Sequence, residues 1–210
     1  MNDYIFPFNT CETPHKNGIA QPYSVVFNLI TCIIIFYFLL KTINIHTFIL
    51  LFSILIFESF HVFSHAIHIP GSIQINITHT LTYFMNISFF NLFYHVTHFF
   101  PSNTFIIYMI FLILLDIYAF SNFSFVYYLA TQSLIFISIL FYYYSSLPKF
   151  IQKSIKIIFF LVLIVIFLFL NEKYNCKKML SIYPHFPYHI FIEIIGIILF
   201  YVICSNFYKL

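Results

Sequence analysis

The sequence predicts an all-α polytopic membrane protein with seven transmembrane helices. Of the 210 residues, 62% are hydrophobic and 7% are charged, and the mean hydropathy is +0.97. This composition excludes a water-soluble globular protein. Apolar runs of the length that a helix needs to cross the hydrocarbon layer recur along the chain, and polar or proline-containing breaks separate them. We therefore expect residues 1–210 to form one membrane domain without a soluble domain.

A polar segment and four apolar runs make up the first part of the chain. Residues 1–18 lack the apolar core of a signal peptide, so membrane insertion is expected to start at the first run. That run, 19–41, ends at a lysine, and the second, 46–68, ends before Ile-Pro-Gly-Ser. The third run, 76–99, ends next to Pro-Ser-Asn, and the fourth, 104–120, ends before Ser-Asn. These breaks contain the residues that most often interrupt helices.

Three further apolar runs complete the set. The fifth, 124–144, ends before Ser-Ser-Leu-Pro. The sixth, 155–170, gives way to the polar stretch 171–184, which we expect to be a loop. The seventh run covers 187–207. An odd number of spans places the two termini on opposite sides of the membrane.

Loop charges and glycosylation sequons indicate the orientation. Five of the nine lysines fall on the C-terminal side, which favours a cytosolic C-terminus. The sequons at Asn76 and Asn122 lie in or next to loops on the N-terminal side, which suits a lumenal face. We expect a multi-pass protein of the endoplasmic reticulum or Golgi type. Its partner is the bilayer, because a net charge of +3 without a clustered basic face argues against nucleic acid.

Ionisable residues inside the second run are a strong functional signal. Such groups are costly in a bilayer, so they usually face a partner or a water-filled cavity. Four of them follow one another at helical offsets and share one helix face: Glu58, His61, His65 and His68. Ser64 precedes His68 by four residues on the same face.

The seventh run opens with a second group of this kind. His185 and His189 form an i, i+4 pair that can hold one metal ion, and Glu193 follows one turn later. Because the second helix ends, and the third and seventh begin, on the same side of the membrane, we expect four histidines to converge: His68, His79, His185 and His189. Three such ligands with an open position are typical of catalytic zinc. Asp116, at a similar depth, could orient a ligand or activate water.

The remaining titratable residues have plainer explanations. Four histidines are expected to be structural or solvated: His15, His46, His95 and His98. For His61 and His65 both interpretations stay open, because they share the face of His68 but lie deeper or to one side. Glu58 lies on the order of 15 Å deeper than His68 and is expected to be a buried packing acid rather than a ligand.

Several short motifs together resemble the alkaline ceramidases, which belong to the CREST group of membrane hydrolases. Seven spans, Ser-x3-His late in the second and His-x3-His at the start of the seventh are typical of that family. Its members begin with a segment like Asp-Trp-Cys-Glu, followed by Ile-Ala-Glu and Asn-Leu-Ile. This sequence has Asn-Thr-Cys-Glu at 9–12, Ile-Ala-Gln at 19–21 and Asn-Leu-Ile at 28–30. The resemblance, that of a divergent member, covers nearly the whole chain.

The resemblance implies a zinc-dependent amide hydrolase that cleaves ceramide or a related membrane lipid into a sphingoid base and a fatty acid. It places zinc on His68, His185 and His189, with Ser64 lining the site. In the family the metal polarises the amide carbonyl and activates water. The family's catalytic Asp corresponds to His79 here, which could act as a general base or as a fourth ligand that closes the site.

The calcium site of the family is eroded in this sequence. Asn9 and Gln21 stand where the family has acids, and only Glu12 persists. The resemblance therefore does not extend to calcium dependence.

Two other functions are alternatives to the hydrolase. One is a catalytically silent relative, lipid-binding or receptor-like, that keeps the zinc for stability. The other is a small transporter that uses Glu58 and Glu193 as proton relays, which leaves the spacing of the histidines unexplained.

The four cysteines divide by position. Cys32 and Cys204 lie inside spans, whereas Cys11 precedes the first span and Cys176 follows the sixth. Seven spans put Cys11 and Cys176 on the same side, which is oxidising if it is the lumen. The sequence is thus compatible with a disulfide between them, the alternative being two free thiols.

Overall fold

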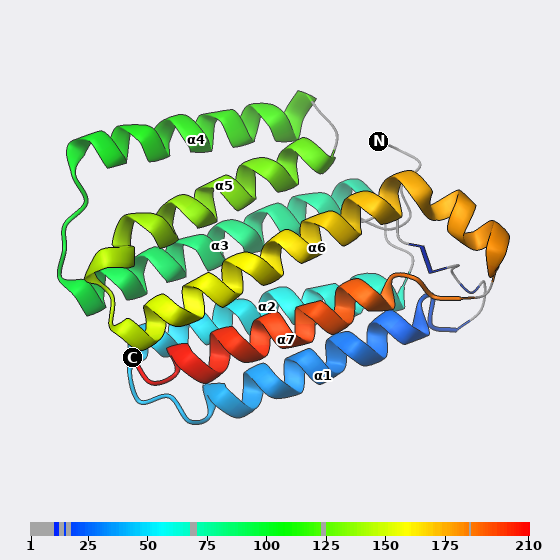
Figure 1. Ribbon diagram of the computed structural model, residues 1–210, viewed down its shortest axis with the longest axis horizontal. Helices are drawn as coiled ribbons and strands as arrows, with labels where there is room; N and C mark the ends of the chain where they lie inside the picture. The colour runs from blue at the N-terminus through cyan, green and yellow to red at the C-terminus, as the bar shows by residue number, and fades with distance from the viewer. Residues whose placement is uncertain (1–10, 13–14, 16–17, 68–70, 123–124, 185) are drawn as a thin grey trace.

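The computed structural model describes residues 11–12, 15, 18–67, 71–122, 125–184 and 186–210 (Figure 1). These residues are helical and contain no β-strand, which confirms the all-α prediction. The described chain forms α1 (Pro22–Leu39), α2 (Ile45–Ala66), α3 (Gly71–Thr97), α4 (Asn103–Asn122), α5 (Phe125–Tyr143), the short 3-10 helix η1 (Tyr144–Ser146), α6 (Lys149–Ile182) and α7 (Ile190–Phe207).

Five helices of the described chain are long and apolar enough to cross a membrane. They are α1, α2, α4 over Asn103–Ser121, α6 and α7. The outward faces of these helices carry large apolar side chains, and Ile33, Ile107 and Phe167 are each 68% exposed. Apolar residues that would be costly in water are favourable against lipid, so the fold is that of a multi-pass membrane protein.

The helices lie side by side with their axes roughly aligned (Figure 1). The helix α1 packs against α2 and α7, and α7 packs against α6. The helix α2 also packs against α3, which is followed by α5 and then by α4 at the edge of the bundle. One apolar core joins the seven α-helices of the described chain and includes Ile35, Leu50, Phe89, Ile158 and Phe207.

The helix α6 is much longer than the sequence predicts. The stretch 171–184 was expected to be a loop, but α6 continues through it as far as Ile182. Residues 171–182 contain no proline or glycine, so nothing stops the helix when its composition turns polar. At 1.5 Å per residue the 34 residues of α6 span roughly 51 Å, more than the hydrocarbon layer. The polar residues mark where the helix leaves the apolar layer and not where it ends.

The ends of α2 and α3 also differ from the predicted bounds. The helix α2 ends at Ala66, and Ile67 is already extended with φ −129° and ψ 155°. The face shared by Glu58, His61 and His65 is therefore helical as predicted, whereas His68 lies outside the described residues. The helix α3 begins at Gly71, five residues before the predicted start of the third run.

The segment before α1 is tied to α1 and to the end of α2. The Glu12 carboxylate accepts hydrogen bonds from the backbone N–H groups of Tyr23 and Ser24, at 3.0 and 3.1 Å, and from the Ser24 hydroxyl. These contacts satisfy N–H groups at the start of α1. The Gln21 backbone N–H donates to the His65 carbonyl over 3.0 Å. The start of α1 is thereby held beside the histidines of α2.

Candidate metal centre

Two histidines of α2 and one acid of α7 form a compact group of potential metal ligands. His61 and His65 lie one turn apart on α2, and their Nε2 atoms are 3.0 Å from each other. Glu193, in the first turn of α7, places Oε1 3.6 Å from His65 Nε2. One donor atom from each of the three residues lies within 4.8 Å of the other two. His65 and Glu193 are buried, and His61 is partly exposed.

His189 joins this group from the residue before α7. Its Nε2 is 3.0 Å from Glu193 Oε1, and its Nδ1 is 2.9 Å from Glu172 Oε2. Glu172 lies on the part of α6 that the sequence did not predict to be helical. His189 is 98% buried between these two carboxylates, and its ring centroid lies 5.4 Å from that of His65.

The ring nitrogens that face away from the group also face acceptors. His65 Nδ1 is hydrogen-bonded to Gln21 Oε1, and Glu58 Oε2 lies 3.7 Å from His61 Nδ1. An acceptor beside Nδ1 favours the tautomer that carries its proton there, which leaves the Nε2 lone pair for a metal. Acceptors beside Nδ1 thus hold both rings with Nε2 toward the centre of the group, as in many proteins whose histidines bind a metal.

The donor set fits zinc. Two histidines and one glutamate are the ligands of a common type of catalytic zinc site, and an i, i+4 histidine pair on one helix supplies two of them. Ligand atoms around a tetrahedral zinc lie about 3.3 Å apart when each is roughly 2.0 Å from the metal. The separations of 3.0 and 3.6 Å lie on either side of that value. Buried Glu193 Oε1 lies 3.0 Å from His189 Nε2 and 3.6 Å from His65 Nε2, and a carboxylate oxygen in this position can also serve as a zinc ligand.

The predicted zinc ligands are only partly covered by the structure. His68 and His185 lie outside the described residues, so a metal site on His68, His185 and His189 stays a prediction. His189 lies in the group as predicted, next to Glu193. For His61 and His65, which the sequence left open, the structure brings both rings together with Glu193. The sequence did not predict that Glu172 and Gln21 would be neighbours of the site. For Gln21 a signal was present, because it is the last residue of the Ile-Ala-Gln motif that resembles the family.

Ser64 lies next to the group but its hydroxyl is engaged. The Ser64 hydroxyl donates to the His61 carbonyl of its own helix over 2.8 Å. Ser64, His61 and Thr78 line a small recess between α2 and α3. The predicted position of Ser64 near a metal site is compatible with this arrangement, and its predicted catalytic role stays a prediction.

His79 belongs to a second polar cluster, centred on Asp116 of α4. His79 Nε2 is 2.8 Å from Asp116 Oδ2, which also accepts hydrogen bonds from the Tyr83 hydroxyl over 2.8 Å and from Gln132 Nε2 over 2.7 Å. The Thr131 hydroxyl donates to the other oxygen of this fully buried carboxylate. Four partners explain how an acid is accommodated inside the bundle. Asp116 thus orients His79, and the predicted catalytic role of His79 is not tested by this contact.

A cavity of about 210 Å³ adjoins the potential metal ligands between α1, α2, α6 and α7. Its polar lining residues are Asn28, Thr31, Glu58, His61, His189 and Glu193. Its apolar lining includes Phe57, Val165, Phe169, Ile192, Leu199 and Phe200. The shape suits a ligand with an apolar chain and one polar group, because the chain can contact the walls while the polar group reaches the ligands.

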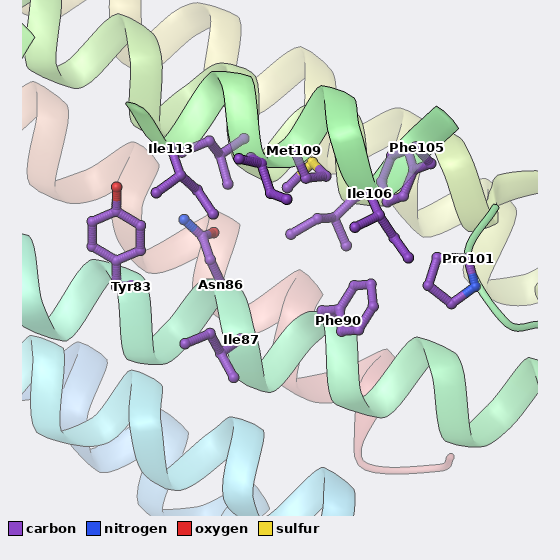
Figure 2. A pocket seen from close by; sticks show the side chains of 12 residues that line it. Tyr83, Asn86, Ile87, Phe90, Pro101, Phe105, Ile106, Met109 and Ile113 are labelled. Atoms are coloured by element: carbon purple, nitrogen blue, oxygen red, sulfur yellow. The ribbon is translucent and has the colours of Figure 1, made fainter. Parts of the chain in front are cut away.

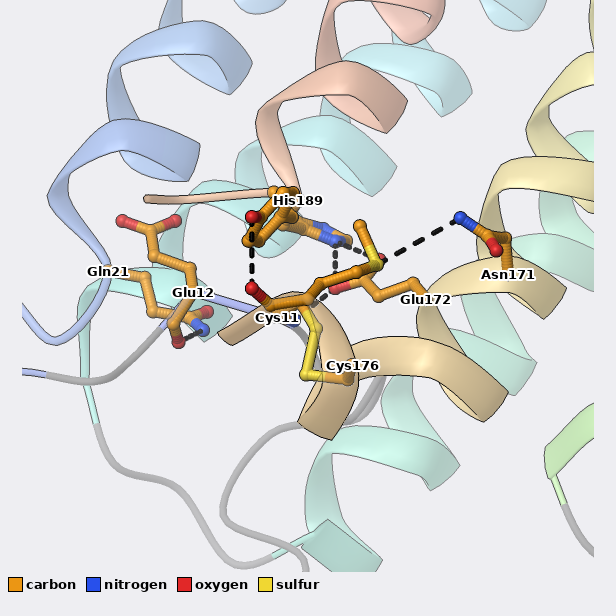
Figure 3. The surroundings of a disulfide bond; sticks show 9 residues. Cys11, Glu12, Gln21, Asn171, Glu172, Cys176 and His189 are labelled. Atoms are coloured by element: carbon orange, nitrogen blue, oxygen red, sulfur yellow. Dashed lines mark hydrogen bonds and ion pairs between the residues drawn. A yellow bond between two sulfur atoms is a disulfide. The ribbon is translucent and has the colours of Figure 1, made fainter. Parts of the chain in front are cut away.

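A disulfide covers the N-terminal side of this site (Figure 3). Cys11 and Cys176 are bonded, with their Cα atoms 5.6 Å apart, so the pairing compatible with the sequence is present and both thiols are oxidised. The Cys11 backbone N–H donates to the Glu172 carboxylate, which also contacts His189. The bond therefore ties the N-terminal segment to the end of α6 directly beside the metal ligands.

Comparison of the chain with protein-family models, with curated proteins and with solved structures gives no match. The features of this chain that bear on its function are the paired histidines of α2, the acid of α7 and the cavity that adjoins them.

Proposed function

We propose that the protein is a zinc-dependent amide hydrolase of the alkaline ceramidase type, held in the membrane by seven spans. Its substrate would be ceramide or a related lipid amide, and its products a sphingoid base and a fatty acid. One observation carries the proposal: His61, His65 and Glu193 bring metal-binding atoms together at the polar lining of a largely apolar cavity. A lipid amide is apolar along its chains and polar at the bond to be cleaved, and the cavity has the same division.

The proposed ligands are His61, His65 and Glu193. Zinc bound there supplies Lewis acidity, which polarises an amide carbonyl and lowers the pKa of water. Gln21 and Glu58 hold the rings of His65 and His61 in place through their Nδ1 sides. This set lies about one helical turn deeper than the one that the family resemblance implies, since His61 and His65 precede Ser64 and His68 by roughly one turn.

His189 is the residue placed to move a proton. Its Nε2 lies 3.0 Å from Glu193 Oε1 and lines the same cavity, and Glu172 fixes the opposite ring nitrogen. We assign to His189 Nε2 the delivery of a proton to the leaving amine, because amide cleavage needs a proton on that nitrogen. His79 remains an alternative base if the metal lies on the set that the resemblance implies.

Metal analysis of the purified protein tests the ligand set. We expect about one zinc per chain in the wild type. His65→Ala and Glu193→Ala should lose it, and His95→Ala, which removes an exposed histidine at the opposite end of the bundle, should keep it. Full zinc content in His61→Ala, His65→Ala and Glu193→Ala would overturn this set. Loss of zinc in His68→Ala alone would support the set on His68, His185 and His189.

Product analysis separates the hydrolase from a silent relative that retains a structural zinc. Wild-type protein in detergent micelles should release sphingoid base from ceramide, and His189→Gln should release at least about 100-fold less, since general acid catalysis contributes factors of this size. A zinc-loaded wild type that leaves ceramide intact would refute the enzymatic function and favour the lipid-binding alternative. A protein without zinc in any preparation would favour the transporter.

A further inference from the structure

A second cavity, of about 230 Å³, lies between α3, α4 and α5, away from the helices that carry the metal ligands (Figure 2). It shares no lining residue with the cavity at His61 and Glu193. Its lining is apolar apart from Tyr83 and Asn86, and includes Phe90, Phe105, Met109 and Ile135. Two further lining residues, Ile87 and Ile110, are 62% and 52% exposed on the outer surface, so the cavity opens toward lipid.

Asn86 presents an unpartnered acceptor in this cavity. Asn86 is 97% buried, and its Oδ1 has no hydrogen-bond partner among the described residues. Figure 2 shows its amide directed from α3 toward α4, between Tyr83 and the apolar residues of the cavity. A buried acceptor without a partner costs about 1–3 kcal/mol, so a ligand that donates a hydrogen bond there would be stabilised.

The Asp116 cluster determines which atom of the Asn86 amide is left over. Gln132 Nε2 donates to the Asp116 carboxylate, which can only accept, so Gln132 Oε1 is free to accept in turn. Asn86 Nδ2 donates to Gln132 Oε1 over 3.0 Å. The remaining atom is Oδ1, and the chain of bonds from Asp116 therefore gives the cavity an acceptor rather than a donor.

We propose that this cavity binds an uncharged lipid alcohol, whose hydroxyl donates to Asn86 Oδ1 and whose apolar part lies along α3, α4 and α5. A carboxylate would face a second acceptor, and an ion of either sign would lose its hydration in an apolar site. The hydroxyl group is the smallest uncharged donor that common membrane lipids carry. The proposal rests on Asn86 and the cavity, and it is independent of the proposed hydrolase function.

The test compares two probes that differ in one hydrogen-bond donor. A photoreactive long-chain alcohol and its methyl ether are titrated into the full-length protein in nanodiscs of phosphatidylcholine, which has no hydroxyl donor. We expect the wild type to bind the alcohol about fivefold to tenfold more tightly than the ether, which is the usual contribution of one hydrogen bond. Crosslinks should map to α3 and α4. Equal binding of the two probes by the wild type would overturn the proposal.

Two variants and one control locate the interaction. Asn86→Leu should bind both probes alike, because the acceptor is removed while the volume is kept. Asn91→Leu removes a neighbouring amide of α3 that contacts His46 and does not line the cavity, and it should keep the preference for the alcohol. Ile110→Trp fills the cavity from α4 without altering a polar group and should weaken binding of both probes. Preference for the alcohol that persists in Asn86→Leu, or crosslinking that persists in Ile110→Trp, would refute the site.

Discussion

His65 shows at the residue scale how the contacts of one ring nitrogen can orient the other toward a potential metal position. The Nδ1 side of its ring contacts Gln21 Oε1, and its Nε2 side faces His61 Nε2 and Glu193 Oε1. Two imidazole nitrogens that both present lone pairs at 3.0 Å repel each other unless a proton or a cation lies between them. The spacing fits a proton shared by the two nitrogens and also a cation bound by both lone pairs.

Replacement of Gln21 tests the support of His65. Gln21→Leu should weaken zinc binding about 10-fold to 100-fold, because loss of a hydrogen bond to a ligand ring lets the ring turn and lowers its basicity. Gln21→Glu should restore or exceed the wild-type affinity, since a carboxylate is the stronger acceptor. Competition with a chromophoric chelator measures both. Gln152→Leu, which removes a glutamine at the start of α6, is the control, and an unchanged affinity in Gln21→Leu would show that His65 is not a ligand.

Asp116 illustrates a different outcome for an intramembrane acid. Its carboxylate has four partners from two helices, α3 and α5, and His79 is one of them. A single sequence cannot distinguish such an acid from a catalytic one, because both are predicted from the cost of an ionisable group in lipid. The contacts hold α3, α4 and α5 together around Asp116. Through Gln132 they also leave Asn86 Oδ1 as an acceptor in the cavity between these helices.

At the element scale, the extension of α6 brings chemistry to the site that a loop would not place there. Glu172 and Cys176 lie one turn apart on this extension. Glu172 contacts His189 and Cys176 is bonded to Cys11, so one rigid helix holds both the N-terminal segment and the ring of His189. The helix fixes the positions of Glu172 and Cys176 relative to each other, because its residues are related by a fixed rise and rotation.

Removal of the disulfide should destabilise the protein. The bond closes a loop with a sequence separation of 165 residues. On the chain-entropy model a loop of this length corresponds to about 5 kcal/mol, and disulfides typically contribute about 2–4 kcal/mol to the free energy of unfolding. The variant with Cys11→Ser and Cys176→Ser should therefore unfold at a lower temperature in detergent, as measured by circular dichroism. A reductant should lower the midpoint of the wild type and leave that of the double variant unchanged.

Cys32→Ser serves as the control for this experiment, because Cys32 is a free thiol in α1. Its unfolding should respond to the reductant as the wild type does. Alkylation of Cys11 and Cys176 without prior reduction, detected by peptide mapping, would contradict the bond and with it the expectation of an oxidising compartment.

At the scale of the whole molecule, the polar side chains that could bind a metal gather at one end of the helices. The potential metal ligands lie where α2 ends and α7 begins, together with the disulfide, whereas the core residues Ile35, Leu50 and Phe207 lie toward the other ends of α1, α2 and α7. Apolar residues also cover the outer surface, so burial alone does not separate inside from outside as it does in water. The inner face of a helix is instead recognised by its close packing against other helices and by polar groups that have hydrogen-bond partners.

Labelling of single cysteines tests the seven-span topology. Asn103→Cys lies at the start of α4, Lys41→Cys follows α1, and Lys177→Cys lies on the extension of α6. In sealed microsomes a membrane-impermeant maleimide should label Asn103→Cys and Lys41→Cys from one side and Lys177→Cys from the other. If neither α3 nor α5 crossed the bilayer, which would leave α1, α2, α4, α6 and α7 as the spans, Asn103→Cys would instead be labelled from the same side as Lys177→Cys.

The sequence by itself determined the membrane class, the helical structure and a short set of ionisable residues. These features follow from composition and from the period of the apolar runs, both of which are local properties of the chain. The order and number of the runs put Cys11 and Cys176 on the same side, which made a disulfide compatible with the sequence, and the structure decided between this bond and two free thiols. The same information predicted that His189 and the polar face of the second run would be close to each other.

Only the tertiary structure decided that His61 and His65 of α2 come together with Glu193 of α7. His61-x3-His65 and Ser64-x3-His68 differ by about one helical turn, and a shift of one turn leaves residues on nearly the same face. The relative depth of two helices is set by packing over their whole length, and no local pattern records it. The same holds for Gln21 and Glu172, whose contacts with His65 and His189 arise because separate helices end at one level.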